Sequence, residues 1–95
     1  MGFMVHIYSY TDGSYNYLYF FPTFEKAHAF AVKEMVETYI KNGYKENGFD
    51  AYPNKNGELV LRYHLIKDAK TLGGVLNDFA EISIIHVEEG KEYVF

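Results

Sequence analysis

The pattern of apolar and polar residues at the start of the chain predicts a β-hairpin within the first 21 residues. Two runs, 3–10 and 15–21, are rich in aromatic and β-branched residues, which favour strands. Between them lies Asp12-Gly13, a pair typical of a two-residue hairpin turn, because both positions of that turn require positive φ. The chain is therefore expected to fold back on itself at this turn.

Counting outward from this turn gives a register that separates the hairpin residues into two sets. One face carries an aliphatic set that is expected to point into the core: Val5, Ile7, Leu18 and Phe20. The opposite face carries what we call the tyrosine set: His6, Tyr8, Tyr10, Tyr15, Tyr17 and Tyr19. A shift by one residue would mix the two sets, so the pattern favours a register in which Tyr10 faces Tyr15.

A helix is predicted after the hairpin, from Thr23 to about Asn42. Thr23 is a suitable N-cap, Glu25 lies in the first turn where the helix dipole favours an acidic residue, and Gly43 is a typical C-terminal stop. Apolar residues recur at helical spacing and form one face: Phe24, Ala27, Ala31, Val32, Met35, Val36, Tyr39 and Ile40. Such a face is suited to packing on a sheet.

The middle of the chain predicts two further strands. Residues 49–52 are interpreted as a short strand, and Pro53 would confine it to the edge of a sheet because proline cannot donate a backbone hydrogen bond. Residues 58–66 alternate regularly, with Leu59, Leu61, Tyr63 and Leu65 on one side and Val60, Arg62, His64 and Ile66 on the other.

A second helix and a closing hairpin are predicted in the last third of the chain. Asp68 is interpreted as the N-cap of this helix, and its apolar face consists of Leu72, Val75, Leu76 and Phe79. Gly73-Gly74 would make its first turn irregular, since each glycine costs about 1 kcal/mol against alanine in a helix. Residues 82–87 and 92–95 would form the hairpin around Gly90.

The resulting order is ββαββαββ, which defines an α+β protein. We expect a mostly antiparallel sheet with two helices on one face. A ferredoxin-like core with one extra strand at each end is the more specific alternative. No linker interrupts the pattern, and 95 residues suffice for one core, so residues 1–95 are expected to form a single domain.

Composition and charge exclude several functional classes. The net charge is −4 and the basic residues form no cluster, which disfavours binding to a phosphate backbone and so makes nucleic acid an unexpected partner. No apolar run approaches the length of a membrane helix, and no secretory signal is visible. The chain also has no cysteine. We therefore expect a soluble, cytoplasmic protein without a membrane partner.

Candidate catalytic chemistry is sparse. His6, His28, His64 and His86 do not show the spacing of metal ligands, no serine lies in a nucleophile motif, and Gly73-Gly74 lacks the context of a phosphate-binding loop. The sequence therefore predicts no catalytic residue, no metal and no cofactor. A small enzyme that uses His6 or His64 with nearby carboxylates is the third-ranked hypothesis.

The tyrosine set remains the main candidate for function. Its residues could simply stabilise the sheet as cross-strand aromatic pairs, or a second helix could cover them. If they are exposed, they form the kind of aromatic patch that protein interfaces favour. The leading hypothesis is a non-enzymatic protein-binding module that uses this set to contact another protein or a second copy in a homodimer. One version is an inhibitor of a host protein encoded by a phage or mobile element. The alternative is a protein that sequesters a small molecule or nucleotide between the rings.

Overall fold

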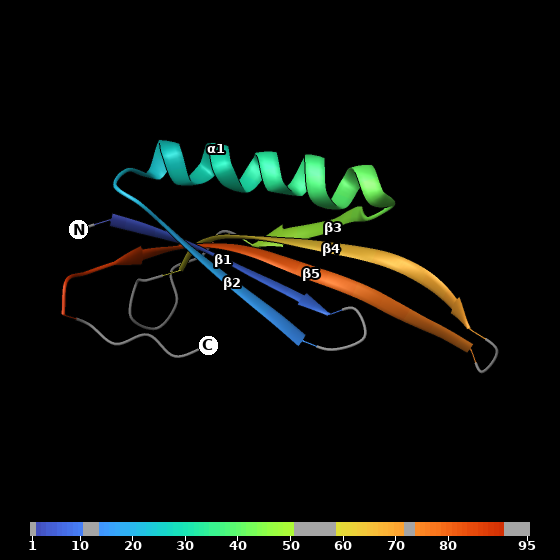
Figure 1. Ribbon diagram of the computed structural model, residues 1–95. Coiled ribbons are helices and arrows are strands. Elements are labelled where there is room, and N and C mark those ends of the chain that lie inside the picture. Colours follow the sequence, from blue (N-terminus) through green and yellow to red (C-terminus); the bar gives the residue numbers. More distant parts are fainter. Residues whose placement is uncertain (1, 11–13, 51–58, 72–73, 91–95) are drawn as a thin grey trace.

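The computed structural model describes residues 2–10, 14–50, 59–71 and 74–90, which form one antiparallel sheet and one helical segment (Figure 1). The elements are β1 (Gly2–Tyr10), β2 (Ser14–Phe21), α1 (Phe24–Glu34), a π-helical turn (Met35–Tyr39), a 3₁₀ turn (Ile40–Asn42), β3 (Lys45–Asp50), β4 (Leu59–Thr71) and β5 (Gly74–Val87).

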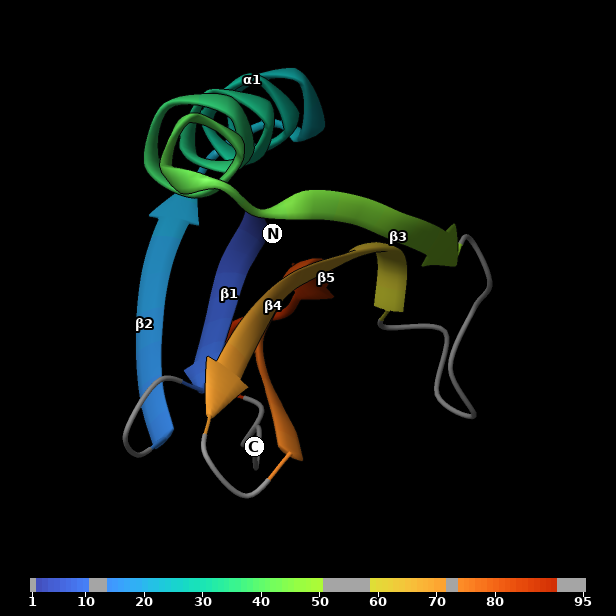
Figure 2. The same ribbon diagram turned by 90° about the vertical axis from the view of Figure 1, so that its right-hand side faces the viewer.

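The five strands lie in the order β2-β1-β5-β4-β3, and each neighbouring pair is antiparallel. The helix α1 covers one face of this sheet and contacts β1, β2 and β5. Seen along the helix, the sheet twists and curves so that β3 and β4 lie away from β2 (Figure 2). The predicted α+β class and the antiparallel sheet are therefore confirmed, whereas the ferredoxin-like order is not.

The first predicted helix is confirmed. The Thr23 hydroxyl oxygen accepts a hydrogen bond from the Lys26 backbone N–H at 3.3 Å, which satisfies one donor of the first turn. Gly43 has φ of 98°, a left-handed conformation that glycine adopts without strain and that ends the helical segment. Met35 and Tyr39, the first and last residues of the π-helical turn, are both buried.

The core lies between α1 and the sheet face that the helix covers. It is built by alternate residues of the strands and by the small residues of α1: Val5, Ile7, Ala27, Ala31, Leu61, Leu65, Ala80, Ile82 and Ile84. Alanines on the helix allow its backbone to lie close to the sheet. The predicted alternation of β4 is confirmed from Leu61 onward, since Leu61 and Leu65 are buried while Arg62 and His64 lie on the opposite face. A shift of register between Leu59 and Leu61 interrupts it at the start of the strand, where Val60 packs against the same core as Leu61.

The predicted second helix is wrong. Residues 59–71 and 74–87 form the two longest strands, β4 and β5, which pair from Leu59 to Thr71. Thr71 pairs with Gly74, so only two residues connect the strands, and Leu72 and Gly73 lie outside the described residues. The physical reason is that adjacent glycines disfavour a helix and favour a tight hairpin, and the β-branched residues that follow favour a strand.

The predicted register of the first hairpin is also wrong, by one residue. Tyr10 pairs with Ser14 and Ile7 with Tyr17, so three residues connect the strands instead of two. The Asp12-Gly13 turn itself lies outside the described residues. Three-residue connections are the next most common hairpin loops, and both faces of β2 are apolar enough to accept either register.

Two further predicted strands, at 49–52 and 92–95, lie partly or wholly outside the described residues. The edge strand predicted at 49–52 is observed as β3, which starts earlier at Lys45, while residues 51–58 lie outside the described residues. The strand predicted at 92–95 also lies outside them. Within the described residues, no helix has both the length and the apolar character needed to span a bilayer.

Candidate functional site: the aromatic edge strand

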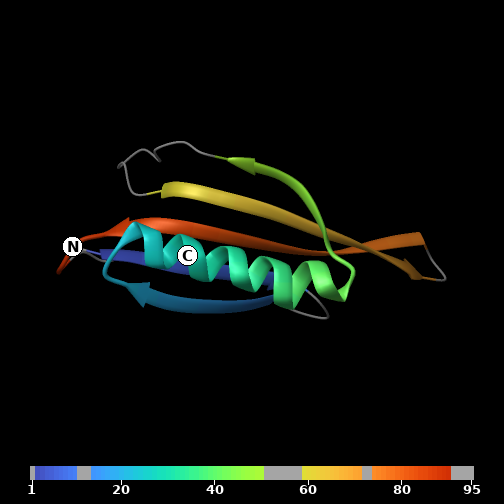
Figure 3. The same ribbon diagram turned by 90° about the horizontal axis from the view of Figure 1, so that it is seen from above.

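The strand β2 forms one outer edge of the sheet, and its surface is the most prominent feature of the described structure. Seen from above, β2 borders the sheet beside α1, and no described strand pairs with its outer side (Figure 3). Every residue from Ser14 to Phe20 is exposed. The backbone N–H and C=O groups that point outward from such an edge are available to another strand.

The exposed side chains of β2 are large and mostly aromatic. The exposed fractions are 49% for Tyr15, 46% for Tyr17, 53% for Leu18, 40% for Tyr19 and 66% for Phe20. Single exposed apolar residues are ordinary, but five in six consecutive positions concentrate exposed apolar area along one edge strand, with three side chains on one face and two on the other. Patches of this kind are characteristic of contact surfaces.

The two outer edges of the sheet differ in the features that protect an edge strand from pairing with another chain. The edge strand β3 contains three charged residues, Lys45, Glu46 and Asp50, and its register shifts between Glu46 and Phe49. Gly48, within this irregularity, has φ of 100°. Charges and bulges of this kind are the usual devices that prevent an edge strand from pairing with another chain. In contrast, β2 has no charged residue and pairs with β1 in an uninterrupted register.

The structure divides the tyrosine set between the two faces of the sheet. Residues opposite each other in an antiparallel pair share a face, so Tyr15, Tyr17 and Tyr19 lie on the helix-covered face with Val5 and Ile7. His6, Tyr8 and Tyr10 lie on the opposite face, which we call the far face. Rings on opposite faces cannot enclose one ligand between them, so the geometry does not favour sequestration by the whole set.

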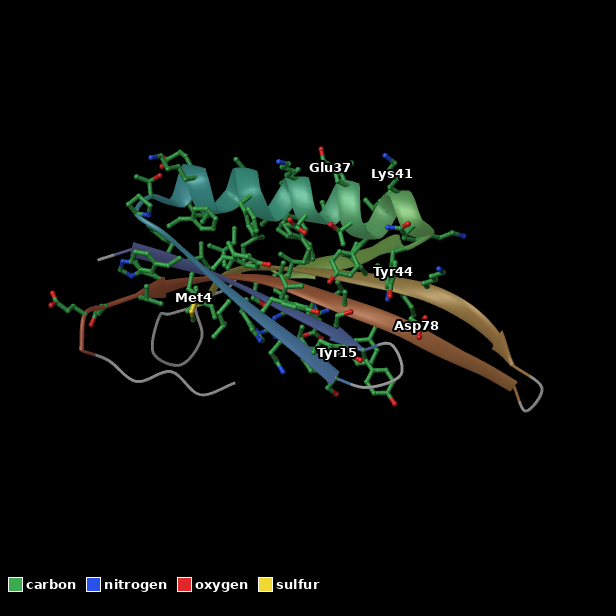
Figure 4. The ribbon with its side chains drawn as sticks, viewed as in Figure 1. Met4, Tyr15, Glu37, Lys41, Tyr44 and Asp78 are labelled. Atoms are coloured by element: carbon green, nitrogen blue, oxygen red, sulfur yellow. The ribbon has the colours of Figure 1, made fainter. Side chains whose placement is uncertain are left out.

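Each half of the tyrosine set has a distinct environment. Tyr19 lies at the edge of the helix, where its ring centroid is 4.6 Å from that of Phe30. Tyr15 lies near the hairpin end of β2 (Figure 4). On the far face, Tyr10 stacks on Phe79 of β5 at 5.4 Å, and the Tyr8 ring is 5.7 Å from the same residue. Phe79 thus provides part of the packing that the expected second helix would have supplied.

Sequence reasoning missed two residues of the exposed patch, Leu18 and Phe20. Both were expected in the core, yet they are the two most exposed large residues of β2. Phe20 lies over Gly2, where an added Cβ would meet the Phe20 ring and come within 2.9 Å of the Phe21 carbonyl oxygen. The absence of a side chain at Gly2 therefore leaves room for the ring. Only the correct hairpin register would have identified this pair.

A second group of polar side chains crosses the middle of the far face. Arg62 Nε donates a hydrogen bond to Ser83 Oγ at 2.9 Å and lies 3.9 Å from a Glu81 carboxylate oxygen. The other Glu81 oxygen is 3.7 Å from His64 Nδ1. Nearby, His6 Nε2 and Asn16 Oδ1 are 2.8 Å apart and connect β1 with β2. The structure therefore brings His64 close to a carboxylate, as the enzyme hypothesis required.

This polar group is better suited to a structural role than to nucleophilic catalysis. Ser83 is only 1% exposed, so a substrate could not reach its hydroxyl. Arginine remains protonated and donates only, so Arg62 cannot accept the proton of Ser83. Among the described residues, no three potential ligands gather in a way that could hold a metal ion. The hydrogen bonds instead join β4 to β5 and β1 to β2 on the far face.

Burial raises the pKa of two tyrosines, Tyr39 in the π-helical turn and Tyr63 on β4. The pKa of Tyr39 is raised mainly by desolvation, and nearby Tyr44, Tyr17 and Glu34 add to this effect, while a hydrogen bond with Ser9 opposes it. The pKa of Tyr63 is raised by desolvation and then by Glu46. The Tyr63 hydroxyl lies 2.9 Å from His28 Nε2. Tyr39 belongs to the core, and Tyr63 is partly buried and packs against it; neither is part of the exposed surface of β2.

Comparison of the chain with protein-family models, with curated protein sequences and with solved structures finds no match.

Proposed function

We propose that this protein is a non-enzymatic protein-binding module whose contact surface is centred on the edge strand β2. The observation that carries this proposal is the exposure of every residue from Ser14 to Phe20 on an edge strand that has no charge and no bulge. An edge of this kind exposes backbone groups and aromatic side chains together, which is the combination that strand addition uses in protein recognition.

The contact surface proposed here differs from the tyrosine set. It retains Tyr15, Tyr17 and Tyr19 and adds Leu18 and Phe20, which the observed register leaves exposed. Tyr10, at 41% exposure, lies beside this surface on the neighbouring strand. His6 and Tyr8 are mostly buried and are expected to support the hairpin rather than contact a partner.

Aromatic residues suit this role for energetic reasons. Tyrosine and phenylalanine bury a large area while losing few rotamers, and such residues dominate the binding energy of many interfaces. The ring of Tyr19 is already held against Phe30, so part of the surface is ordered before binding. A preordered surface loses less entropy when the complex forms.

A capture experiment with matched variants tests the proposed function. The immobilised protein is exposed to a cell extract that also contains a second copy with a different tag. Tyr17→Lys adds a charge to β2, and Val36→Lys adds the same charge to the helix at a residue of nearly equal exposure, 47% against 46%. Because Tyr17 and Val36 are each nearly half exposed, both variants are expected to keep a melting temperature close to that of the unmodified protein.

We expect the unmodified protein and Val36→Lys to capture the same partner protein, and we expect Tyr17→Lys not to capture it. The retained protein can be either the tagged copy or another chain. The proposed function is wrong if none of the three retains any protein, or if Tyr17→Lys retains the same protein as the control with equal affinity.

A further inference from the structure

We infer that the partner of β2 is β2 of a second copy of this chain, paired antiparallel about a two-fold axis that passes through Tyr17. This inference rests on the proposed function and specifies its partner. The two five-stranded sheets would join into one continuous sheet, with both helices on the same face.

The backbone of β2 is suited to pairing along its whole exposed length. Its register with β1 is continuous from Phe3 opposite Phe21 to Tyr10 opposite Ser14. In a regular antiparallel strand, the groups that do not bond to one neighbour point evenly toward the other side. A second strand can therefore bond to the outer side of β2 without local distortion.

The side chains of β2 are compatible with their own copies. A two-fold interface places the same strand against itself, so any charge on it would come close to a like charge. No residue from Ser14 to Phe21 is charged. An axis through Tyr17 sets that residue opposite its own copy and sets Tyr15 opposite Tyr19 on the helix-covered face.

The axis through Tyr17 is favoured because it uses every exposed residue of the strand. The exposed stretch runs from Ser14 to Phe20, and Tyr17 is its midpoint. On the far face, the same axis sets Leu18 opposite Asn16 of the second copy. An axis through any other residue would leave part of the exposed stretch without a strand opposite it.

The area available on β2 is sufficient for a small specific dimer. A buried aromatic side chain contributes about 150–250 Å², so four rings that are 40–66% exposed offer roughly 400 Å² on each copy. These rings are Tyr15, Tyr17, Tyr19 and Phe20. With Leu18 and the strand backbone of both copies, the total reaches the ~1,000 Å² at the lower limit of specific interfaces.

The other edge of the sheet explains why the assembly would close as a dimer. After β2 pairs with its copy, both remaining edges of the joined sheet are β3 strands. These carry Lys45, Glu46 and Asp50 and an irregular register, which disfavour further strand addition. The asymmetry between the two edges thus favours a closed pair over a fibre.

Charge reversal at the axis provides a direct test. We measure the dimer dissociation constant by sedimentation equilibrium for the unmodified protein, for Tyr17→Lys, for Tyr17→Glu and for an equal mixture of the two variants. Each variant alone places like charges opposite each other and is expected to weaken the dimer at least about ten-fold. The mixture places opposite charges together, so it is expected to form a dimer more readily than either variant alone. Val36→Lys serves as the control and should not change the constant.

Several outcomes would overturn the inference. A protein that remains monomeric at about 100 μM excludes a second copy as the partner, although the proposed function survives if the capture experiment retains another chain through Tyr17. A dimer that neither variant weakens is not formed through β2. Weakening without recovery in the mixture contradicts the axis through Tyr17. If the variants at Tyr17 do not fold, Leu18→Lys and Leu18→Glu replace them. In the proposed pairing, Leu18 of each copy lies opposite Asn16 of the other copy. Each Leu18 variant must therefore weaken the dimer.

Discussion

At the scale of single residues, tyrosine has two separate structural roles in this chain. Tyr39 is 7% exposed and packs edge-on against Tyr44 with 5.1 Å between ring centroids, while Tyr63 contacts His28 under the helix. Tyr39 belongs to the core, and Tyr44 and Tyr63 are partly buried and pack against it. Tyr15 and Tyr17 are nearly half exposed and belong to the surface of β2. Composition alone does not distinguish the two roles, because a tyrosine suits a half-buried position in either environment.

The buried tyrosines predict a loss of stability at alkaline pH. Because burial raises the pKa of Tyr39 above its ordinary value of 10.0, the folded protein retains a phenol proton that the unfolded chain releases. The corresponding stabilisation is fully present below pH 10 and is lost as the pH rises toward the raised pKa of the folded state. We expect the melting temperature to fall above pH 10, and to fall less in Tyr39→Phe.

Thermal unfolding followed by circular dichroism between neutral and alkaline pH measures this effect. Tyr15→Phe is the matched control, since it removes a hydroxyl from a ring that is 49% exposed. An alkaline loss of stability that is equal in Tyr39→Phe and in the unmodified protein would show that Tyr39 is not responsible.

At the scale of elements, the sequence identifies the first helix well and the strand register poorly. Thr23, Gly43 and the apolar spacing between them define the helix locally, so no distant contact is needed to predict it. The hairpin register depends instead on a three-residue connection and on which side of β2 packs against Phe30. Both sides of β2 carry large apolar residues, so their pattern does not determine which side faces the helix.

The helix predicted after Asp68 was wrong for a related reason. Spacing of apolar residues by three and four positions over 72–79 predicted a helix there, but the residues from Gly74 onward belong to β5, and Leu72 lies outside the described residues. In the described structure, residues 74–78 pair with β4 beyond the end of β1, so the long hairpin with β4 holds them in a strand. Short apolar runs can fit either a helix or a strand, so their spacing alone does not separate the two. Tertiary pairing therefore determined the structure of this segment.

The central position of β5 predicts a strong dependence of stability on its core residues. Ile84 is fully buried between Val5 of β1 and Leu61 of β4. We expect Ile84→Ala to lower the free energy of unfolding by about 2–5 kcal/mol, because it removes buried methyl groups and leaves a cavity. Val36→Ala on the exposed side of the helix should change it by less than about 0.5 kcal/mol. Chemical denaturation measures both values, and equal effects of the two substitutions would contradict the assignment of this core.

At the scale of the whole molecule, the two edges of the sheet differ in how well they are protected from pairing with another strand. One face is covered by α1, and the far face carries a linked group of polar side chains between apolar rows (Figure 4 shows Met4 on this face). The edge at β3 is protected by charge and irregularity. The edge at β2 is not protected, although it is long and regular. This asymmetry is the feature from which the proposed function follows.

The candidate site could be predicted only in part from the sequence. The aromatic content of the first hairpin predicted an aromatic surface that includes Tyr15, Tyr17 and Tyr19, and these three side chains are exposed. Sequence analysis could not show that β2 is an edge strand, since strand order depends on pairing between β1 and β5, which are far apart along the chain. It also assigned Leu18 and Phe20 to the core, because that assignment depends on the register.

Amide hydrogen exchange along β2 tests the central claim most directly. In the monomer, the amides that point outward from Ser14 to Phe20 face no other described strand and should exchange quickly, whereas those bonded to β1 should be protected. When the binding surface is occupied, by a second copy at high protein concentration or by a captured partner, the outward amides should become protected in an alternating pattern while β3 does not change. If the exchange of β2 is the same with the surface occupied as in the dilute monomer, the edge strand is not the contact surface.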